Sequence, residues 1–398
     1  MMTTATATKV FADRIGRIEV SATMAVTAEA AKLRAQGAKL VDFGAGEPHF
    51  ATPRHIKDAA IEAINENFTR YTTVSGIPEV RKAIVERHAC DFGSDYAPDE
   101  AVFTTGGKLA IFNAIQVLVD HGDEVIVPVP YWVSYKDIVQ YGGGRPVYLE
   151  TEEAENFRIS AEAIEKAITP RTKAILLNSP SNPAGSVISP ADLERIVRLA
   201  HERGIYLLLD ECYAYLQYTG APVSGGSFTD CKEHVIVLGS LSKTYAMTGW
   251  RAGFALGPKP IIAAMSKLQS QSTSSTAHFV QKAAVAALNG SQQCVAEMRA
   301  DYLALRDRIL GRLAEIQGIT CTKPEGAFYV YPNVSAYLGK PGAQTTLELA
   351  SRLLHEAHVV TVPGEAFGTK KHLRLAYAVT PADVDEGVER MKVFFAKL

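Results

Sequence analysis

Short apolar runs alternate with segments of helical periodicity through the middle of this 398-residue chain. The runs have the length of strands, and helix-period segments such as Lys108–Asp120, Trp132–Tyr141 and Ala191–Arg203 lie between several of them. This order is typical of an α/β fold in which helices cover both faces of a mostly parallel sheet. The expected strands are Ala101–Thr104, Glu124–Val127, Pro146–Leu149, Lys173–Asn178, Ile205–Asp210, His234–Leu238 and Ala252–Leu256.

The two ends of the chain follow a different pattern, in which helices outweigh short strands. Ser270–Thr276 is expected to lie between two helices. The elements expected outside the central region are a helix over Thr23–Gln36, a long polar helix from about residue 291 to Glu315, strands at Phe328–Tyr331, Val359–Thr361 and Leu373–Ala376, and a closing helix from Pro381. We therefore expect two domains, a large one over residues 51–299 and a smaller α+β domain built from residues 1–50 and 300–398.

Composition excludes several classes of function. Hydrophobic residues make up 47% and charged residues 21%, as in ordinary globular proteins. The 41 Lys and Arg against 43 Asp and Glu give a net charge of -2, which argues against nucleic acid or anionic lipid as a partner. No apolar run has membrane-spanning length, and the first residues lack a secretory pattern. Five scattered cysteines without a CxxC pair indicate reduced thiols and a cytoplasmic protein.

The segment Gly239–Arg251 follows an expected strand and places Lys243 among small and hydroxyl residues. A partly desolvated lysine in such a place can act as a nucleophile that forms a Schiff base. Ser240, Ser242 and Arg251 would supply hydrogen bonds and positive charge to a phosphate. Taken alone, the segment also fits an ordinary surface lysine in a polar loop.

Two glycines, Gly106 and Gly107, stand between an expected strand and the helix that follows. Such a turn lets backbone N–H groups approach a phosphate at the positive end of a helix dipole. Lys108 strengthens this interpretation, because a cation at a helix N-terminus is disfavoured unless an anion binds there too. A plain tight turn is the alternative.

Three further candidate site residues lie on or next to expected strands. Asp210 ends an apolar strand, where a carboxylate needs a partner, and a ligand, a helix cap or a salt bridge would each provide one. Trp132 follows a strand and is suited either to the core or to stacking on a ligand. Arg374 lies on an apolar strand near the C-terminus.

Taken together and in this order, these stretches resemble the class I aminotransferases of the aspartate aminotransferase fold, which use pyridoxal 5′-phosphate (PLP). The resemblance extends from about residue 14 to the end of the chain. It implies the PLP-dependent transferase fold type I, with a mostly parallel seven-stranded sheet in the large domain. The stretches that carry it are Gly44–Pro48, Tyr71–Pro78, Thr105–Lys108, Pro130–Tyr135, Ser179–Pro183, Asp210–Tyr213, Ser240–Arg251, Pro324–Tyr329 and Arg374.

The resemblance implies a role for each matching residue. Lys243 would bind PLP covalently and shuttle a proton between the substrate Cα and the cofactor C4′. Asp210 would pair with the ring nitrogen and keep it protonated, so that the ring absorbs the electrons left by Cα–H cleavage. Tyr213 and Asn182 would hydrogen-bond the ring 3-oxygen, and Trp132 would stack on the ring. The residues at the phosphate would be Gly106, Gly107, Ser240, Ser242 and Arg251, with Lys108 beside them.

The family also implies how the substrate and a second subunit take part. Arg374 would clamp the substrate α-carboxylate, and the backbone at Gly46 would close over it, with Trp132 and Asn182 nearby. Tyr71 in this family reaches the phosphate of the neighbouring subunit, which implies a homodimer with shared active sites. An amino acid and a 2-oxo acid would be the substrates.

The choice of substrate rests on fewer residues. In the bacterial subgroup that this chain resembles, Lys108 and Thr23, with Ser21 nearby, receive the side-chain carboxylate of aspartate or glutamate; N-capping of a helix is the alternative role for Ser21 and Thr23. We expect aspartate and 2-oxoglutarate as the pair, with prephenate, glutamate or aromatic amino acids as the alternative. His49 and the loop Val362–Phe367 depart from the usual family sequence and could reshape the pocket.

Three rival patterns fit less well. Ser240–Lys243 satisfies the SxxK pattern of serine acyl enzymes, but the chain has no KTG element. Gly44–Gly46 begins a dinucleotide-binding fingerprint, but His49 stands where the third small residue belongs. His355–His358 is not an HExxH zinc motif, so no metal site is expected.

Overall fold

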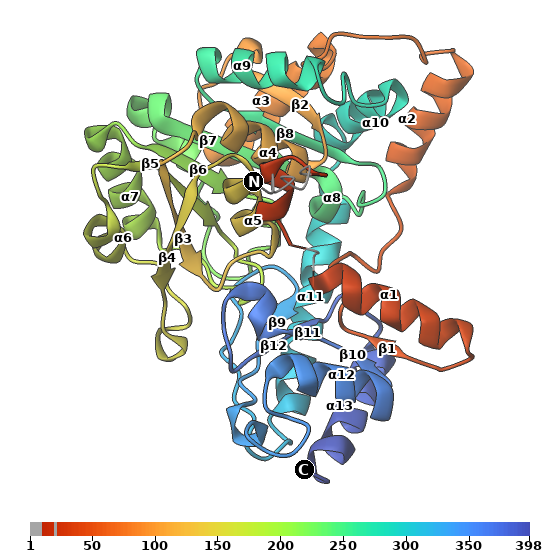
Figure 1. Ribbon diagram of the computed structural model, residues 1–398. Helices are drawn as coiled ribbons and strands as arrows, with labels where there is room; N and C mark the ends of the chain where they lie inside the picture. Colours follow the sequence, from red (N-terminus) through yellow and green to blue (C-terminus); the bar gives the residue numbers. More distant parts are fainter. Residues whose placement is uncertain (1–9, 20–21) are drawn as a thin grey trace, which may run out of the picture.

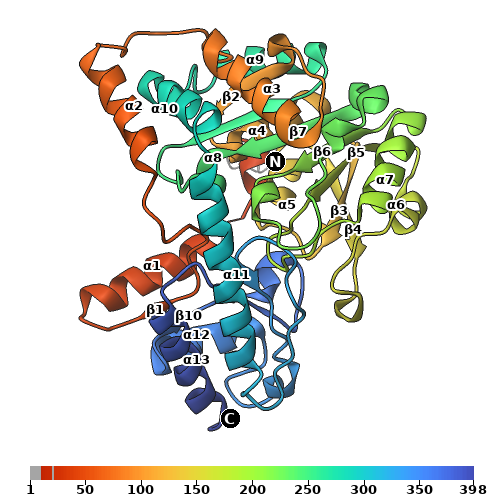
Figure 2. The ribbon, with the colours of Figure 1, turned by 180° about the vertical axis from the view of Figure 1, so that it is seen from behind.

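A computed structural model of the chain describes residues 10–19 and 22–398, and the side chains of all of these except residues 22–25. A larger part, built on a seven-stranded sheet, lies above a smaller part in Figure 1. The long helix α11 (Gln293–Leu313) runs from the larger part down into the smaller one, which is clearest from behind (Figure 2).

The large sheet has the strand order β2-β8-β7-β6-β5-β3-β4, and β8 is antiparallel to both of its neighbours. The start of β8 therefore lies at the same edge as the carboxyl ends of the parallel strands, with Thr105 opposite Ala252 and Ser240 opposite Gly253. The strands are β2 (Ala101–Thr105), β3 (Glu124–Val129), β4 (Arg145–Glu150), β5 (Thr172–Asn178), β6 (Tyr206–Asp210), β7 (Val235–Ser240) and β8 (Ala252–Leu256).

Alternate strand residues face two layers of helices, because successive side chains of a strand point to opposite faces. Phe103 and Leu177 belong to one buried cluster, and Val102 and Leu176 belong to another on the opposite face. The first face is covered by α2 (Arg54–Asn65), α3 (Pro78–Phe92), α6 (Ala161–Ala167), α7 (Pro190–Arg203) and α10 (His278–Asn289). The second face is covered by α4 (Gly107–Leu118), α5 (Ser134–Tyr141) and α9 (Lys259–Ser270).

The smaller part joins the two ends of the chain. Val41 of β1 (Val41–Asp42) pairs in parallel with Val359 of β10 (Val359–Val360), and a three-stranded sheet of order β11-β12-β9 lies beside them. Its separate apolar core includes Phe43, Tyr302 and Phe394. The remaining elements are β9 (Tyr329–Val330), β11 (Val362–Pro363), β12 (Leu373–Ala376), α1 (Ala22–Ala35), α12 (Thr346–Glu356) and α13 (Pro381–Phe395). The expected domain boundaries at residues 50 and 300 stay a prediction.

Most expected elements are present, and the α/β fold with its seven strands is confirmed. Ser270–Thr276 does connect two helices, α9 and α10. The helix expected from Trp132 begins only at Ser134, so Trp132 lies in the loop between β3 and α5. Helices α2, α3, α6 and α12 are additional to the expected elements.

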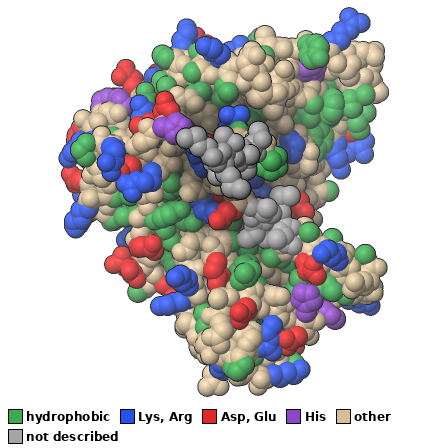
Figure 3. All heavy atoms as spheres, in the orientation of Figure 1, with side chains coloured by type: hydrophobic (Ala, Val, Ile, Leu, Met, Phe, Trp, Pro, Cys, Tyr) green, Lys and Arg blue, Asp and Glu red, His purple; other side chains and the backbone are tan. Residues whose placement is uncertain are grey.

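Both kinds of charged side chain are interspersed over the face shown in Figure 3, in keeping with a net charge of -2. Within residues 10–19 and 22–398, no helix combines the length and the hydropathy that crossing a bilayer requires.

Candidate active site

A cavity of about 310 Å³ lies at the carboxyl edge of the large sheet, and residues of the smaller part also line it. The sequence-predicted residues that line it are Gly46, Gly107, Lys108, Trp132, Asn182, Asp210, Tyr213, Ser240, Ser242, Lys243, Arg251 and Arg374. Lining residues without a predicted role are Ile111, Val133, Ser134, Asn178, Cys212, Thr248 and Tyr329.

Of the other four predicted site residues, two are described in full. Gly106 lies in the turn before α4, next to the guanidinium of Arg251. The side chain of Tyr71 is 95% exposed and does not line the cavity of its own chain. Ser21 lies outside the described residues, and so does the side chain of Thr23, whose backbone belongs to α1.

The topology of the sheet explains how distant residues meet at this edge. Asp210 is the last residue of β6, and Ser240 is the last of β7, with Lys243 following in the short helix α8 (Leu241–Thr244). Arg251 directly precedes β8, whose antiparallel direction brings its start to the same edge. Ligands of α/β proteins collect at this edge of the sheet, and the residues predicted from strand ends do converge there.

The turn at Gly106 and Gly107 packs directly against β8. Gly106 has a φ of +85°, and a Cβ there would lie 2.5 Å from a nitrogen of Arg251. A Cβ on Gly253 would lie 2.3 Å from the backbone nitrogen of Gly107. Glycine at these positions lets the N-terminus of α4 approach Arg251, which creates a small site of backbone N–H groups and positive charge suited to an anion.

Ser240 has a structural role in the fold as well. Its hydroxyl accepts a hydrogen bond from the backbone N–H of Ser242 at 3.2 Å and so caps α8. This cap orients the short helix that presents Lys243 to the cavity. The Lys243 ammonium donates a hydrogen bond to the carbonyl of Gly46, and burial lowers its pKa.

Asp210 is a buried carboxylate held by two donors. The Tyr135 hydroxyl donates to one carboxylate oxygen at 2.7 Å, and the backbone N–H of Cys212 donates to the other at 3.1 Å. Burial raises the pKa of Asp210 to about 6, and both hydrogen bonds act in the opposite direction. A cationic group in the cavity would complete the environment of this carboxylate. Sequence reasoning missed Tyr135, although it lies three residues after Trp132 in a stretch that the family resemblance had marked.

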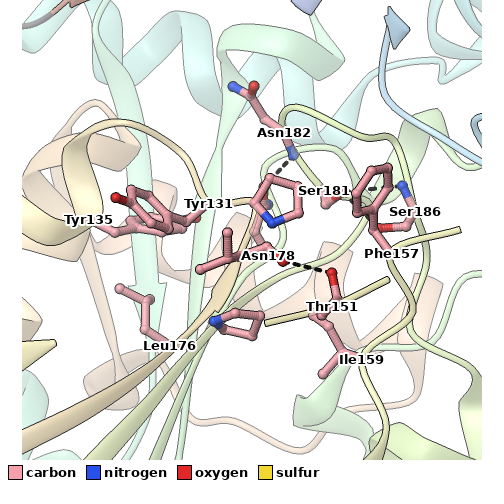
Figure 4. A pocket seen from close by; sticks show the side chains of 13 residues that line it. Tyr131, Tyr135, Thr151, Phe157, Ile159, Leu176, Asn178, Ser181, Asn182 and Ser186 are labelled. Carbon is pink, nitrogen blue, oxygen red and sulfur yellow. Dashed lines mark hydrogen bonds between the residues drawn. The ribbon is translucent and has the colours of Figure 1, made fainter. Parts of the chain in front are cut away.

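A pair of asparagines forms the adjacent wall. The Asn178 side chain accepts from the backbone N–H of Asn182 and donates to the backbone carbonyl of Asp210, each at 2.8 Å. A second, small cavity of about 20 Å³ lies behind these residues, bordered also by Tyr135 and Thr151 (Figure 4). This space suffices for about one water molecule. The wall that carries Asn182 is thus fixed from behind by hydrogen bonds.

Arg374 is only 3% exposed and lies between two aromatic rings. Its guanidinium carbon lies 4.7 Å from the ring centre of Tyr329 and 5.1 Å from that of Phe367. It donates to the carbonyl of Gly44 at 2.7 Å and to the side-chain oxygen of Asn182 at 3.2 Å. The second bond orients the Asn182 amide so that its NH₂ group is free to donate elsewhere. The Nε of Arg374 is buried and has no hydrogen-bond partner among the residues that the structure describes.

The two departures from the family sequence do not line the cavity. The His49 ring lies 3.4 Å from an Asp301 carboxylate oxygen and packs on Tyr302, on the side of α11. In the segment Val362–Phe367, Val362 pairs with Arg374 across β11 and β12, and the Phe367 ring lies beside the Arg374 guanidinium. For this segment the expected effect on the pocket is therefore an indirect one through Arg374, and for His49 the expectation stays a prediction.

Charge in the cavity is unbalanced. Among the described residues, four cationic side chains line it, namely Lys108, Lys243, Arg251 and Arg374, against one carboxylate, that of Asp210. This surplus predicts ligands that carry several negative charges. Within the described part of the chain, no group of three or more His, Cys, Asp and Glu residues could hold a metal ion.

Solved structures share this architecture. Aspartate aminotransferase from Thermus thermophilus with maleate superposes with a TM-score of 0.92 at 41% identity, over 97% of this chain and 99% of the other. Aspartate aminotransferase from Rhizobium meliloti gives a TM-score of 0.92 at 40% identity, with the same coverage. Fold and site together define an aminotransferase, an enzyme that moves an amino group from an amino acid to a 2-oxo acid.

The sequence comparisons assign the family. Residues 38–391 match the family model of aminotransferase class I and II, and the chain belongs to this family. Aspartate aminotransferase from Geobacillus stearothermophilus is 43% identical over 96% of this chain and 98% of its own length. Aspartate/prephenate aminotransferase from Nitrosomonas europaea is 41% identical over 95% of this chain and 98% of its own length.

Proposed function

We propose that this enzyme uses PLP to transfer the amino group of aspartate to 2-oxoglutarate. The proposal rests on the observation that Lys243 and Asp210 line the same cavity, and that this cavity carries a surplus of positive charge. The names of similar proteins, which include aspartate aminotransferases, support the choice of aspartate.

The residues of the cavity fit PLP. Asp210 is a buried carboxylate whose pKa is raised to about 6, so a nearby cation would stabilise its charged form. A protonated pyridine ring would supply that cation. The glycine turn before α4, together with Ser240 and Arg251, offers backbone N–H groups, hydroxyl and guanidinium to a phosphate. Trp132 also lines the cavity and would offer an aromatic face to the cofactor ring. Phosphate, ring and aldehyde of PLP thus each find a matching group.

The residues of this chain divide the reaction between them. PLP, when bound, supplies an aldehyde that combines with amines and a ring that accepts the electrons of the broken Cα–H bond. Lys243, with its pKa lowered by burial, is suited to take the proton from the substrate Cα and to return it. Asp210 holds the charge at the ring nitrogen, and Arg374 binds and orients the substrate α-carboxylate.

Lys108 supports an acidic substrate. It lines the cavity from the first turn of α4, and its ammonium lies 4.9 Å from the centre of the Trp132 ring. Desolvation and the nearby Arg251 lower its pKa. A second carboxylate on the substrate would relieve the repulsion between these two cations.

A prephenate-like substrate is the second candidate. A further cavity of about 570 Å³, with Leu109, Phe112 and Ile138 in its wall, shares Lys108 and Arg251 with the active site. An apolar space beside the same ammonium would accommodate a ring that bears a carboxylate. The aspartate/prephenate aminotransferase among the similar proteins supports this alternative.

A donor panel with two variants tests the proposal. Wild-type protein with added PLP is expected to be coloured and to turn over aspartate with 2-oxoglutarate, whereas Lys243→Ala is expected to lose both properties. Lys108→Ala should lower kcat/KM for aspartate about 10- to 100-fold, as expected for one lost charged contact, but leave that for alanine nearly unchanged. Lys267→Ala, at an exposed position on α9, is the matched control. Equal losses for both donors would contradict the assignment of Lys108 to the substrate.

We also propose a homodimer with shared sites. Tyr71 is exposed and does not line the cavity of its own chain, and Ile61 and Ile64 of α2 are about half exposed on the isolated chain. A second copy that covers this face would bring Tyr71 to its phosphate site. Mixing Tyr71→Phe with Lys243→Ala should then restore activity, through hybrid dimers with one intact site. No recovery after full subunit exchange would contradict shared sites.

Two further assignments belong with this proposal. The separate apolar cores of the two parts support a large domain over residues 51–299 and a small one over residues 1–50 and 300–398, with α11 crossing between them. The five cysteines are unpaired, which supports a cytoplasmic location.

A further inference from the structure

Tyr329 lines the cavity but has no role in the function proposed so far. Its ring is buried on β9, and its hydroxyl lies 2.8 Å from the hydroxyl of Tyr213. The Arg374 guanidinium covers its ring at 4.7 Å, and a Cβ on Gly46 would lie 2.8 Å from its oxygen. One side chain thus touches the predicted ring-binding residue, the carboxylate-binding residue and the loop that accepts the Lys243 hydrogen bond.

Tyr213 and Tyr329 each have one hydroxyl proton to donate. Burial raises the pKa of Tyr329 to about 12 and that of Tyr213 well above its usual range, so both phenols keep their proton at neutral pH. Each phenol can then donate only one hydrogen bond. Within the described part of the chain, the structure gives neither hydroxyl another hydrogen-bond partner. If Tyr213 donates to a ligand, only Tyr329 remains to donate to the Tyr213 oxygen.

Packing fixes the position of the Tyr329 hydroxyl. The Tyr329 ring meets Tyr213 edge to face with centres 5.7 Å apart, and it contacts Phe328 at 4.8 Å. With Arg374 over its face, the ring has no room to turn its hydroxyl away from Tyr213. The Tyr329 oxygen is therefore held beside Tyr213 whether or not a ligand is bound.

We infer that Tyr329 is a positioning residue for the cofactor: its hydroxyl donates to the Tyr213 oxygen and thereby directs the Tyr213 proton to the ring 3-oxygen. This inference rests on the proposed PLP function and adds a residue to it. A hydrogen bond received by Tyr213 also polarises the bond that Tyr213 donates, which strengthens it.

The pH dependence of the cofactor's visible absorbance tests the inference without measuring turnover. A hydrogen-bond donor at the ring 3-oxygen stabilises the negative charge on that oxygen. It therefore lowers the pH at which the cofactor chromophore loses its proton. Tyr213→Phe should raise that midpoint by about one unit, the equivalent of one lost hydrogen bond. Tyr329→Phe should raise it by about 0.3 unit, since it only weakens the same bond.

The double variant provides the decisive comparison. If Tyr329 acts through Tyr213, then Tyr329→Phe added to Tyr213→Phe should cause no further shift. This variant also leaves no hydroxyl of the pair unpaired, so it guards against a folding defect in Tyr329→Phe alone. Tyr331→Phe is the matched control, because this buried hydroxyl bonds Thr369 at 2.5 Å and does not line the cavity.

The outcomes separate the inference from the function on which it rests. A coloured wild type with an unshifted or lowered midpoint in Tyr329→Phe would overturn the inference alone. A further shift in the double variant would overturn action through Tyr213. A wild-type protein that stays colourless with PLP would overturn the proposed function, and the inference with it.

Discussion

One wall of the cavity consists of the carboxyl edge of the large sheet, whereas the opposite wall is assembled from segments far apart along the chain. We call the first the cofactor wall, which carries Asp210, Ser240, Lys243 and Arg251. We call the second the substrate wall, made by Gly46, Tyr329 and Arg374. Strand ladders position the cofactor wall. The substrate wall combines short strands with side-chain contacts: Arg374 lies on β12, which pairs with β9 at Tyr329, and its side chain also bonds Gly44 and Asn182.

This difference has a physical consequence for mutations. Each residue of the cofactor wall lies at or near the end of a buried strand, so its position survives the loss of a neighbouring side chain. Arg374 and Tyr329 lie on the paired strands β12 and β9, and the guanidinium of one also stacks on the ring of the other. We therefore expect changes in the substrate wall to spread to its other members, while changes in the cofactor wall stay local.

Arg374→Lys should have the largest effect. A lysine cannot keep the paired hydrogen bonds and the stacking on Tyr329 and Phe367. Because the interactions that this change removes are worth about 3 kcal/mol, kcat/KM for aspartate should fall about 100-fold. Fluorescence titration should show that the affinity for PLP is unchanged, if the two walls are independent.

The matched control is Arg352→Lys, at an arginine that also stacks on an aromatic ring, Phe394, but lies in the small part away from the cavity. Its kinetics should equal those of the wild type. A parallel loss of PLP affinity in Arg374→Lys would show that the walls are coupled and would contradict the comparison.

Gly46→Ala should have the next largest effect. The new methyl group would lie 2.8 Å from the Tyr329 oxygen and must displace it, at a cost of about 1–2 kcal/mol in unfolding free energy. In a Tyr329→Phe background that oxygen is absent, and the same substitution should cost less than half as much. Urea unfolding of the four proteins measures the difference. Equal costs in both backgrounds would place the strain elsewhere, for instance at the carbonyl that Lys243 contacts.

The sequence placed the residues of the cofactor wall at one edge of the sheet. Asp210 ends an apolar run and Lys243 follows another, and the carboxyl ends of parallel strands meet at the same edge. Tyr329 and Tyr135 were not assigned roles, because their importance lies in hydroxyl contacts across 116 and 75 residues of sequence. No local pattern encodes such contacts. Placing Ser21 and Thr23 in the site stays a prediction.

The smallest expected effect is an increase in the free energy of unfolding when the charge of Asp210, in the cofactor wall, is removed. Without cofactor, the pKa of Asp210 is raised from 3.8 to about 6, so its carboxylate lowers the free energy of unfolding increasingly as the pH rises across that interval. At pH 8 the full penalty is about 3 kcal/mol.

Asp210→Asn removes this charge but leaves one of its two donors, Tyr135 or the Cys212 N–H, without an acceptor, which costs about 2 kcal/mol. The cofactor-free variant should therefore be more stable than the wild type by about 1 kcal/mol at pH 8 and no more stable at pH 4. Added PLP should reverse the order at pH 8, since only the carboxylate stabilises a protonated ring. Asp385→Asn, at a surface ion pair with Arg308, is the control and should show no such pH-dependent gain. If the variant is less stable than the wild type at pH 8 without cofactor, the protein itself already stabilises the charged carboxylate of Asp210. The cofactor wall would then not depend on a bound cation to balance this charge.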